Sequence, residues 1–303
     1  MLNDKAYEES YSRPLNTDQI KGRNTQNEFS FLGEKFNKPY YKNMLIRHHT
    51  CLANNRYSQQ SNYAYNVPNW KDDVRNCANY FNSNIVMDPY DNKNSPLFIA
   101  AQAPKPNNFP RFMSLLMTLF VPLIITIVEK HELLYACSDY WTSEKLLINS
   151  EGDNFSSSLI SANDFYESRN LMLNSRKSPS IKLNHLHIYK WIDNSAVTAE
   201  NYQHIINVYD HLRKLREISD PRYGIPYVFI HCSAGLGRTG TFIAGFFLYN
   251  EFKEAQSKNK PFYFSVFHIV KTIREMRYNA VLTQVQYDSL YQLANYLSRM
   301  DNK

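Results

Sequence analysis

The 303-residue chain is poor in cysteine, and none of its four cysteines stands in a metal or redox motif. Cys51, Cys77, Cys137 and Cys232 are scattered, without the close pairs typical of zinc ligands or of redox-active dithiols. So few and such widely spaced cysteines indicate a reducing compartment. The cysteines therefore predict neither a metal site nor a disulfide-stabilised secreted fold.

Recognisable targeting and membrane segments are also missing. The N-terminal residues, MLNDKAYEESYSR, contain no apolar signal region, and neither end carries a myristoylation or prenylation motif. The most apolar stretch, residues 112–128, is short for a membrane span and contains Pro122. We interpret it as a core helix ending near Phe120, followed by a buried strand from Leu123 to Val128. We therefore predict no membrane insertion.

The sequence has no block of basic residues, no regular alternation of basic and aromatic residues, and no internal repeat. A formal net charge of +6 suits anionic ligands but does not indicate nucleic acid binding. Hydrophobic residues make up 43% of the chain, which is typical of a globular protein. This length can bury a sizeable core, in one large α/β domain or two small ones.

The most informative stretch is residues 228–240, VFIHCSAGLGRTG. An apolar strand is predicted before it, over Tyr227–Ile230, and a buried helix after it, over Thr241–Phe252. A loop of small residues between a strand and a helix start points its N–H groups inward, so it can stabilise a phosphate or the thiolate of Cys232. Five residues later Arg238 can return to the sulfur and hold two phosphate oxygens. The alternatives are a coincidental glycine turn and a redox thiol, although no partner cysteine lies close in sequence.

The segment HCSAGLGRTG resembles the signature loop of the tyrosine-specific protein phosphatases, Cys-x5-Arg with flanking His and Ser/Thr. The resemblance implies that Cys232 is the nucleophile and that Arg238 holds the phosphoryl group. It also implies that Thr239 eases departure of the thiolate, that His231 tunes it, and that no cofactor or metal is needed. The residues of the loop that would bind the phosphoryl oxygens are Ser233, Ala234, Gly235, Leu236 and Gly237.

Further segments follow in the order of that family. Residues 54–57, NNRY, resemble its KNRY segment, which implies that Tyr57 walls a pocket too deep for phosphoserine. Residues 79–83, NYFNS, are similar to its DYINA, and residues 98–104, FIAAQAP, to its YILTQGP. Residues 277–287, RYNAVLTQVQY, resemble RxxMVQTxxQY, in which Gln286 matches the second glutamine.

A strand is predicted over residues 183–189, and it leads to a candidate general acid. His185 and His187 share one face of this strand; ordinary buried histidines are favoured over a metal pair, because no third ligand is evident. The next residues, Trp191-Ile192-Asp193, resemble the family's mobile Trp-Pro-Asp loop. The resemblance implies that Asp193 protonates the leaving tyrosinate, and the alternative is an ordinary turn aspartate. Ile192 replaces proline, so closure of the loop is expected to be less preorganised.

Residues 127–130, IVEK, and 137–141, CSDYW, resemble the strand and loop that precede the family's Tyr-Trp-Pro motif. The resemblance implies that Glu129 pairs with Arg238 and orients it. The alternative is a solvated surface carboxylate.

Two more departures keep a rival interpretation open. Gln59 stands where the family has an aspartate that holds the substrate backbone, and Leu282 stands where it has its first glutamine. Together with Ile192 they favour a phosphotyrosine-binding module that turns over poorly, whereas Cys232 and Arg238 favour the enzyme. A dual-specificity phosphatase is disfavoured by Tyr57 and by the length of the chain.

The resemblance covers about residues 54–297 and implies a single α/β domain, a highly twisted mixed sheet with helices on both sides. We place this domain at residues 51–300, after an N-terminal helical and loop extension at residues 1–50 that packs on it. The composition, rich in Asn, Lys, Tyr and Phe, resembles the phosphatases carried by polydnaviruses of parasitoid wasps. That resemblance implies action on phosphotyrosine-containing proteins in the cytoplasm of host cells. The particular substrate and the oligomeric state stay open.

Overall fold

The computed structural model describes residues 2–68, 77, 79–92, 95–141, 145–149, 152–218 and 224–301. Within these residues one sheet of eight strands runs through the molecule, in the order β1-β2-β8-β3-β7-β6-β5-β4. The strands are β1 (Ser83–Val86), β2 (Leu97–Ala101), β3 (Leu123–Ile127), β4 (Leu146–Leu147), β5 (Asn154–Ala162), β6 (Tyr166–Asn174), β7 (Ile181–Ile188) and β8 (Tyr227–His231). Strands β2, β8, β3 and β7 are parallel to their neighbours in that group, and the outer pairs are antiparallel. The predicted mixed sheet is therefore confirmed.

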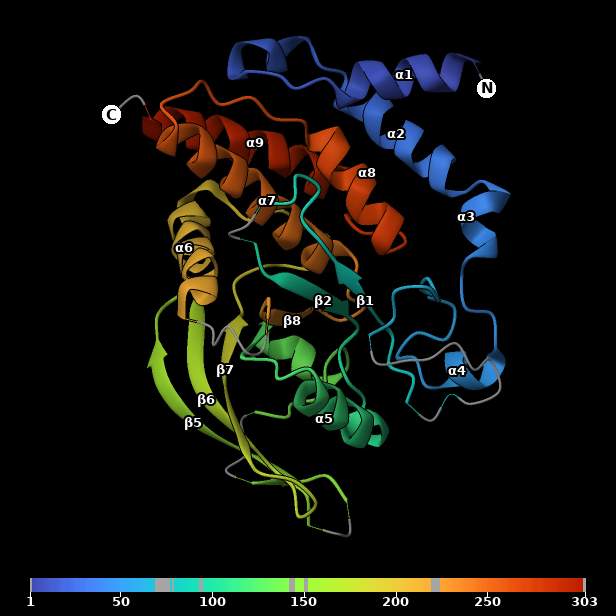
Figure 1. The fold of residues 1–303 in the computed structure, drawn as a ribbon, viewed down its shortest axis with the longest axis vertical. Helices are drawn as coiled ribbons and strands as arrows, with labels where there is room; N and C mark the ends of the chain where they lie inside the picture. Colours follow the sequence, from blue (N-terminus) through green and yellow to red (C-terminus); the bar gives the residue numbers. More distant parts are fainter. Residues whose placement is uncertain are drawn as a thin grey trace.

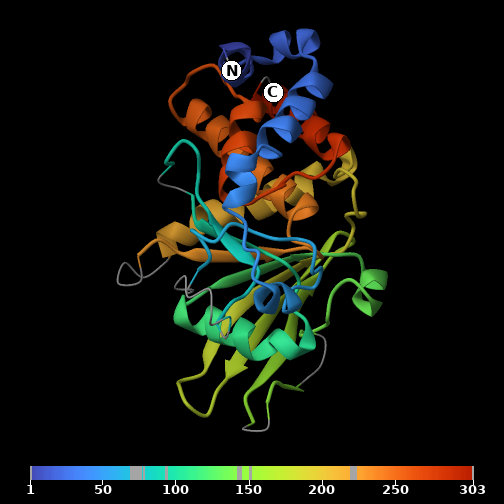
Figure 2. The same cartoon turned by 90° about the vertical axis from the view of Figure 1, so that its right-hand side faces the viewer.

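Helices cover both faces of the sheet (Figures 1 and 2). Helix α5 packs on one face, and α6, α7, α8 and α9 form the layer on the other. The α-helices are α1 (Leu2–Ser12), α2 (Thr25–Phe36), α3 (Pro39–Asn43), α4 (His49–Ala53), α5 (Phe109–Thr118), α6 (Tyr202–Ile218), α7 (Gly237–Ser257), α8 (Val266–Met276) and α9 (Gln284–Asp301). Four short 3-10 helices join them: η1 (Thr17–Gly22), η2 (Pro106–Asn108), η3 (Lys130–Leu134) and η4 (Ala199–Asn201).

The central strands are apolar at successive positions because both of their faces are covered. In β8, Val228 and Ile230 pack in the core on the side of α6–α9, and Phe229 packs in the core that includes α5. Successive side chains of a strand point to opposite faces, so an unbroken apolar run feeds both cores. The same double burial explains why no alternation marks this strand in the sequence.

The longest apolar stretch of the sequence forms α5 and β3, as expected. Helix α5 ends at Thr118, two residues earlier than predicted, and all five residues of β3 are buried. In the described part of the chain, no helix combines the length and the apolar character that crossing a membrane requires.

The N-terminal residues form α1, η1, α2, α3 and the start of α4, which is more helix than predicted. Figure 1 shows α1 and α2 lying over α8 and α9. The buried carboxylate of Glu28 in α2 ties them together: it pairs with Arg23 at 2.6 Å and accepts hydrogen bonds from Tyr287 and Tyr291 at 2.7 and 2.6 Å. A buried charge needs such partners, so α2 docks on α9 in one position.

The four parallel strands end at the same edge of the sheet. The segments that leave their carboxyl ends begin at residues 102, 232, 128 and 189, after β2, β8, β3 and β7. In open α/β sheets this edge is where ligands bind. The stretch from His231 to Gly240, singled out from the sequence, leaves β8 there.

Candidate active site

The loop between β8 and α7 turns six consecutive carbonyl groups outward. Hydrogen bonds of 2.8–3.2 Å from surrounding donors reach the carbonyl oxygens of residues 232–237; the donors are His231, Ala103, Arg277, Gly240, Val281 and Thr241. Within a planar trans peptide unit the following N–H points away from the carbonyl. The N–H groups of residues 233–238 therefore point to the inside of the loop, where they form a set of donors for an anion at the start of α7.

Two glycines make this tight loop possible. Gly235 has φ +70°, and a Cβ there would lie 1.9 Å from the carbonyl oxygen of Ala101. A Cβ at Gly240 would lie 2.6 Å from the backbone nitrogen of Val281. Any side chain at Gly235 would thus be strained and would push the loop away from β2.

Cys232 is the first residue of the loop, and its exposed fraction is only 3%. At the start of α7 and beside Gly237, three buried side-chain donors have no hydrogen-bond partner among the described residues: Arg238 Nε, Thr239 Oγ1 and Gln286 Nε2. Buried polar atoms are nearly always paired, so unpaired ones require an explanation. Three unpaired donors next to a set of inward N–H groups form a cradle for a group with several anionic oxygens.

The guanidinium of Arg238 is fully buried and held by Glu132, not by Glu129. Its two terminal nitrogens donate to the Glu132 carboxylate at 2.5 and 2.7 Å, a bidentate ion pair. Burial alone would lower the pKa of Arg238, but the hydrogen bonds that it donates to Glu132 raise it above its usual value. Burial would likewise raise the pKa of Glu132, and the bonds to Arg238 hold it below its ordinary range.

The expected pairing with Glu129 is wrong because of a short turn of helix. Glu129 is the N-cap of η3, and the turn brings the third helical residue, Glu132, back toward the sheet. The backbone N–H of Glu129 donates to Glu132 Oε2 at 2.7 Å and so helps to position that carboxylate. The sequence does show a second glutamate, Glu132, three residues after Glu129, but the resemblance pointed to Glu129.

The segment from Trp191 to Ser195 packs against the same arginine. Arg238 donates to the carbonyl oxygen of Trp191 at 3.2 Å, and its guanidinium lies 3.1 Å from the carboxylate of Asp193. Trp191 is buried and donates from its indole to Ser195, whereas the side chain of Asp193 is 54% exposed. The structure thus brings Asp193 to the loop while leaving its carboxylate accessible, and Ile192 is also exposed.

Tyr57 stands at the opening of the loop, with its hydroxyl 2.5 Å from Ser233 Oγ and its ring partly exposed. Its neighbour Arg56 fixes this position by bonding to the carbonyl oxygens of Ala103 and Pro104 at 3.2 and 2.7 Å. The aromatic face next to the loop is therefore held rigidly, which suits stacking on another ring.

Residues 280–286 close the other side of the loop. Gln286 Oε1 accepts from the backbone N–H groups of Leu282 and Thr283 at 3.0 and 3.2 Å, and a Cβ at Gly237 would lie 2.9 Å from Gln286 Nε2. Leu282 is partly exposed. The hydroxyl of Thr283 donates to the carbonyl oxygen of Asn194 at 3.2 Å, so this segment contacts the Asp193 segment.

A buried polar chain lies behind the cysteine. His231 Nδ1 donates to the carbonyl oxygen of Cys232 at 2.8 Å, and its Nε2 lies 2.9 Å from the hydroxyls of both Tyr140 and Thr126. Burial lowers the pKa of His231 to about 3, so the ring is neutral and Nε2 is an acceptor. His185 joins the chain through Thr126 at 2.9 Å, and His187 donates to Val128 at 2.8 Å. Each strand histidine thus has a protein partner, as the sequence favoured, but His185 Nδ1 has none among the described residues.

One element of the cradle was not identified from the sequence. Arg277, buried to 2% exposure, donates to the carbonyl oxygens of Ala234 and Gly235 at 3.2 Å each and to Asn84 at 3.0 Å. Burial lowers its pKa to about 10. In the sequence this arginine was only the first residue of a motif. Its bond to Gly235, 42 residues away in the sequence, forms because α8 packs beside the loop.

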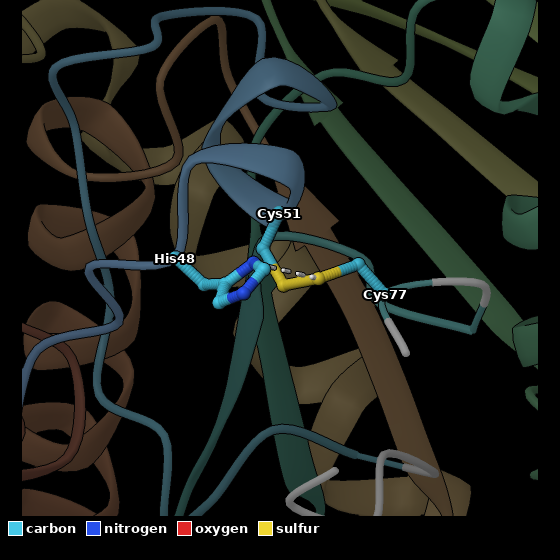
Figure 3. Close-up of side chains that lie close together, drawn as sticks. All are labelled: His48, Cys51 and Cys77. Carbon is cyan, nitrogen blue, oxygen red and sulfur yellow. Dashed lines mark hydrogen bonds between the residues drawn. A yellow bond between two sulfur atoms is a disulfide. The ribbon is translucent and has the colours of Figure 1, made fainter. Parts of the chain in front are cut away.

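The cysteines are not all separate, contrary to the prediction. Cys51 in α4 and Cys77 form a disulfide, with Cα atoms 5.2 Å apart, and His48 lies beside it (Figure 3). Only Cys137 and Cys232 are free, and both are buried. Twenty-six residues separate the bonded pair, so no local spacing marks it in the sequence.

Comparison with known proteins agrees with this architecture. The profile of the family described as protein-tyrosine phosphatase matches residues 51–296, most of the chain. The chain therefore belongs to the protein-tyrosine phosphatase family.

Particular relatives are distant. The chain is 27% identical over 220 residues to human tyrosine-protein phosphatase non-receptor type 12, covering 71% of this chain and 26% of that protein. It is 26% identical over 208 residues to tyrosine phosphatase H3 of Microplitis demolitor bracovirus, covering 67% of this chain and 62% of that one. The chain spans only about a quarter to a third of the first curated relatives it matches.

Solved structures share the fold. The structure of Trypanosoma brucei protein tyrosine phosphatase TbPTP1 superposes with a TM-score of 0.73 at 21% identity and covers 94% of each chain. A structure described as the basis of the PTPN18 fingerprint on HER2 tyrosine phosphorylation sites gives 0.73 at 22% identity, covering 94% of this chain and 99% of that one.

Proposed function

We propose that this chain hydrolyses phosphotyrosine in proteins through a cysteinyl-phosphate intermediate. The observation that carries the proposal is the loop that begins at Cys232, with its inward N–H groups and the three unpaired buried donors at the start of α7 and beside Gly237. It matches a phosphoryl group, which presents three anionic oxygens to donors on every side. Arg238, fixed by Glu132, offers its unpaired Nε–H and, beside it, the terminal nitrogen that faces the exposed carboxylate of Asp193. These two neighbouring N–H groups form a planar pair of the kind that binds phosphate.

The first step forms an S–P bond from the Cys232 thiolate and breaks the bond from phosphorus to the tyrosine oxygen. The donors of the loop stabilise the equatorial oxygens as charge develops on them. Asp193, exposed and 3.1 Å from the Arg238 guanidinium, gives its proton to the departing phenolate. In the second step Asp193 takes a proton from water, the water oxygen bonds to phosphorus, and the S–P bond breaks to release phosphate and the thiolate.

Tyr57 supports a tyrosine substrate. A ring at the rim, with its hydroxyl anchored on Ser233, sets the depth of the pocket so that a phosphorylated aromatic side chain reaches Cys232. Shorter phosphoserine would stop above the cradle. The chain offers Gln59, an exposed amide, to the substrate backbone.

We further propose that the protein acts in the cytoplasm of an infected host cell. Two relatives, tyrosine phosphatase H3 and probable tyrosine phosphatase protein H4, come from Microplitis demolitor bracovirus. A thiolate nucleophile also favours a reducing compartment. The substrates would be phosphotyrosine-containing proteins of that cell.

The test is phosphate release from a phosphotyrosyl peptide and from its phosphoseryl counterpart. The wild-type chain should hydrolyse the first and leave the second, and Cys232→Ser should release none while keeping the same thermal unfolding midpoint. If the wild type binds the phosphotyrosyl peptide without releasing phosphate, the chain is a binding module rather than an enzyme.

A further inference from the structure

Three side chains with metal-ligating atoms converge away from the catalytic loop. His48, Cys51 and Cys77 bring one nitrogen and two sulfur atoms within 4.8 Å of one another (Figure 3). His48 Nδ1 faces Cys77 Sγ at 4.0 Å. The cluster lies beside a small core of its own, made of Ile46, Cys51, Val67, Cys77 and Tyr80, whereas Cys232 belongs to the large core. It is therefore a second centre with its own surroundings.

We propose that this cluster is a zinc site when its two cysteines are reduced. Two thiolates and one imidazole are ligands that zinc prefers, and His48 with Cys51 has the short spacing of a local ligand pair, with the third ligand supplied from a distant segment. The 5.2 Å between the two Cα atoms lets both sulfurs reach one ion with small side-chain rotations. Solvent completes the tetrahedron, because His48 is only half-buried and opens the fourth position to water.

The surroundings suit such an ion. Cys51 is fully buried and Cys77 is 8% exposed, so two thiolates in this position need a cation to offset the cost of burying charge. The hydroxyl of Thr50 lies 2.6 Å from His48 Nδ1 and 3.3 Å from Cys77 Sγ, between the two ligands. An ion at this point would replace that hydroxyl as the partner of the imidazole.

The bonded and the metal-bound cysteines are two states of one site. A dithiol reductant supplies two electrons and two protons, the S–S bond breaks into two thiols, and the reductant becomes a disulfide. Zinc then displaces both thiol protons into solvent, and His48 gives a nitrogen lone pair. That the reduced state is the working one rests on the proposed function, since the same reducing conditions keep Cys232 a thiol.

A zinc ion here would stabilise the segment that carries Tyr57, without contacting the substrate. Cys51 lies in α4, which leads directly into Asn54–Tyr57, and Cys77 accepts a backbone hydrogen bond from Tyr80 at 3.2 Å just before β1. Either the disulfide or the ion ties these two segments together. The proposed role is structural, holding the segment that presents Tyr57.

The test measures metal directly and does not depend on activity. The full chain carrying Cys232→Ser, reduced and equilibrated anaerobically with Zn²⁺, should keep one zinc per chain by native mass spectrometry after desalting. Cys51→Ser and Cys77→Ser should each lose it, and His48→Asn should weaken zinc binding by about tenfold or more. His49→Asn is the matched control, because His49 is exposed and stacks on His48, and it should leave the zinc in place.

A second measurement does not need the cysteine variants, and it therefore still decides if those variants do not fold. Co²⁺ added to the reduced chain with intact Cys51 and Cys77 should give sulfur-to-metal charge transfer and the intense visible bands of a tetrahedral ion, and oxidation to the disulfide should abolish them. Zinc kept equally by folded Cys51→Ser and Cys77→Ser variants would overturn the site, as would the absence of zinc when alkylation shows both thiols free. A disulfide that dithiols leave intact in the native protein would also overturn it. All these readouts use an inactive chain, so they fail or succeed independently of the phosphatase assay.

Discussion

Glu132 and Arg238 form the most buried ion pair at the candidate active site, with exposed fractions of 3% and 0% and two hydrogen bonds of 2.5 and 2.7 Å. The geometry fixes the plane of the guanidinium. It leaves Arg238 Nε unpaired and one terminal nitrogen next to Asp193. We therefore expect the arginine to meet a phosphoryl group in a preset orientation, which lowers the entropic cost of binding it.

Replacing Glu132 by Gln should damage both stability and turnover. The amide loses the charge and turns an NH2 group toward a buried guanidinium, which should lower the free energy of unfolding by about 3–5 kcal/mol. With Arg238 misplaced, kcat/KM for a phosphotyrosyl peptide should fall by about 10²-fold. Urea unfolding and steady-state kinetics measure the two effects. Glu129→Gln is the matched control and should change stability by less than about 0.5 kcal/mol; equal damage from both changes would contradict the assignment.

Asp193→Ala should slow hydrolysis of phosphotyrosyl peptides by about 10²–10⁴-fold, the usual contribution of a general acid. The side chain is exposed, and only its contacts with Arg238 and Asn194 are lost, so the fold should persist. The variant should still retain phosphorylated proteins in a pull-down, and inorganic phosphate should elute them. A substrate with a far better leaving group should lose much less rate, and hydrolysis of peptides at the wild-type rate would show that another group is the acid.

Leu282 should make the second chemical step slow. In the resembled family a glutamine here positions the attacking water, and leucine offers neither donor nor acceptor. Losing one such hydrogen bond costs about 1–2 kcal/mol, or about five- to thirtyfold in rate. We expect Gln286 to compensate in part, because its Nε2 is unpaired beside the loop while its Oε1 is already bonded to Leu282 and Thr283.

Rapid mixing with an aryl phosphate should therefore show a burst of phenolate close to one per active site, then a slow steady state. Leu282→Gln should shrink the burst and raise the steady rate, whereas Val285→Gln, at another exposed apolar position nearby, should do neither. A linear wild-type time course that Leu282→Gln leaves unchanged would mean that water is already positioned by another residue.

Lowering the pH should destabilise the fold already at pH values well above those at which carboxylates gain protons. Burial lowers the pKa of His231 to about 3 and that of His185 well below its usual 6.5. Above pH 6.5 the folded and unfolded chains carry both histidines neutral. As the pH falls from 6.5 toward 3, only the unfolded chain gains these protons, so the free energy of unfolding decreases by up to about 1.4 kcal/mol per pH unit for each histidine.

Urea unfolding at several values between pH 7 and pH 5 measures this slope. His185→Gln should reduce the slope by the contribution of about one bound proton. His131→Gln, at an exposed position, should leave the slope unchanged. Glu132 and Glu167 have lowered pKa values and lose their contribution only at lower pH, which keeps the two effects apart. Burial raises the pKa of Glu251 to about 7, so the folded chain also gains a proton in this range, which offsets part of the slope. A slope that His185→Gln leaves unchanged would contradict the neutral, buried state of that histidine.

The residues from Tyr227 to Phe252 show what the sequence predicted well. Strand, loop and helix start are contiguous, so the apolar run, the small residues and Arg238 lie together whatever the rest of the chain does. The same holds for the apolar stretch that became α5 and β3. Asp193 and Gln286 were found because each stands in a recognisable segment, and the structure places both beside the loop.

What the sequence by itself determined is thus the family, through motifs that resemble it, and with the family the mixed sheet. Short-range periodicity added only the local strands and helices around the site. Only the tertiary structure decided that Glu132 rather than Glu129 holds Arg238, since one turn of a 3-10 helix selects the carboxylate. It also decided that Arg277 supports the loop and that Cys51 meets Cys77 beside His48. The bonded partners lie 26 to 106 residues apart, and their contacts exist only because the sheet and the packing of its flanking helices bring distant segments to one place.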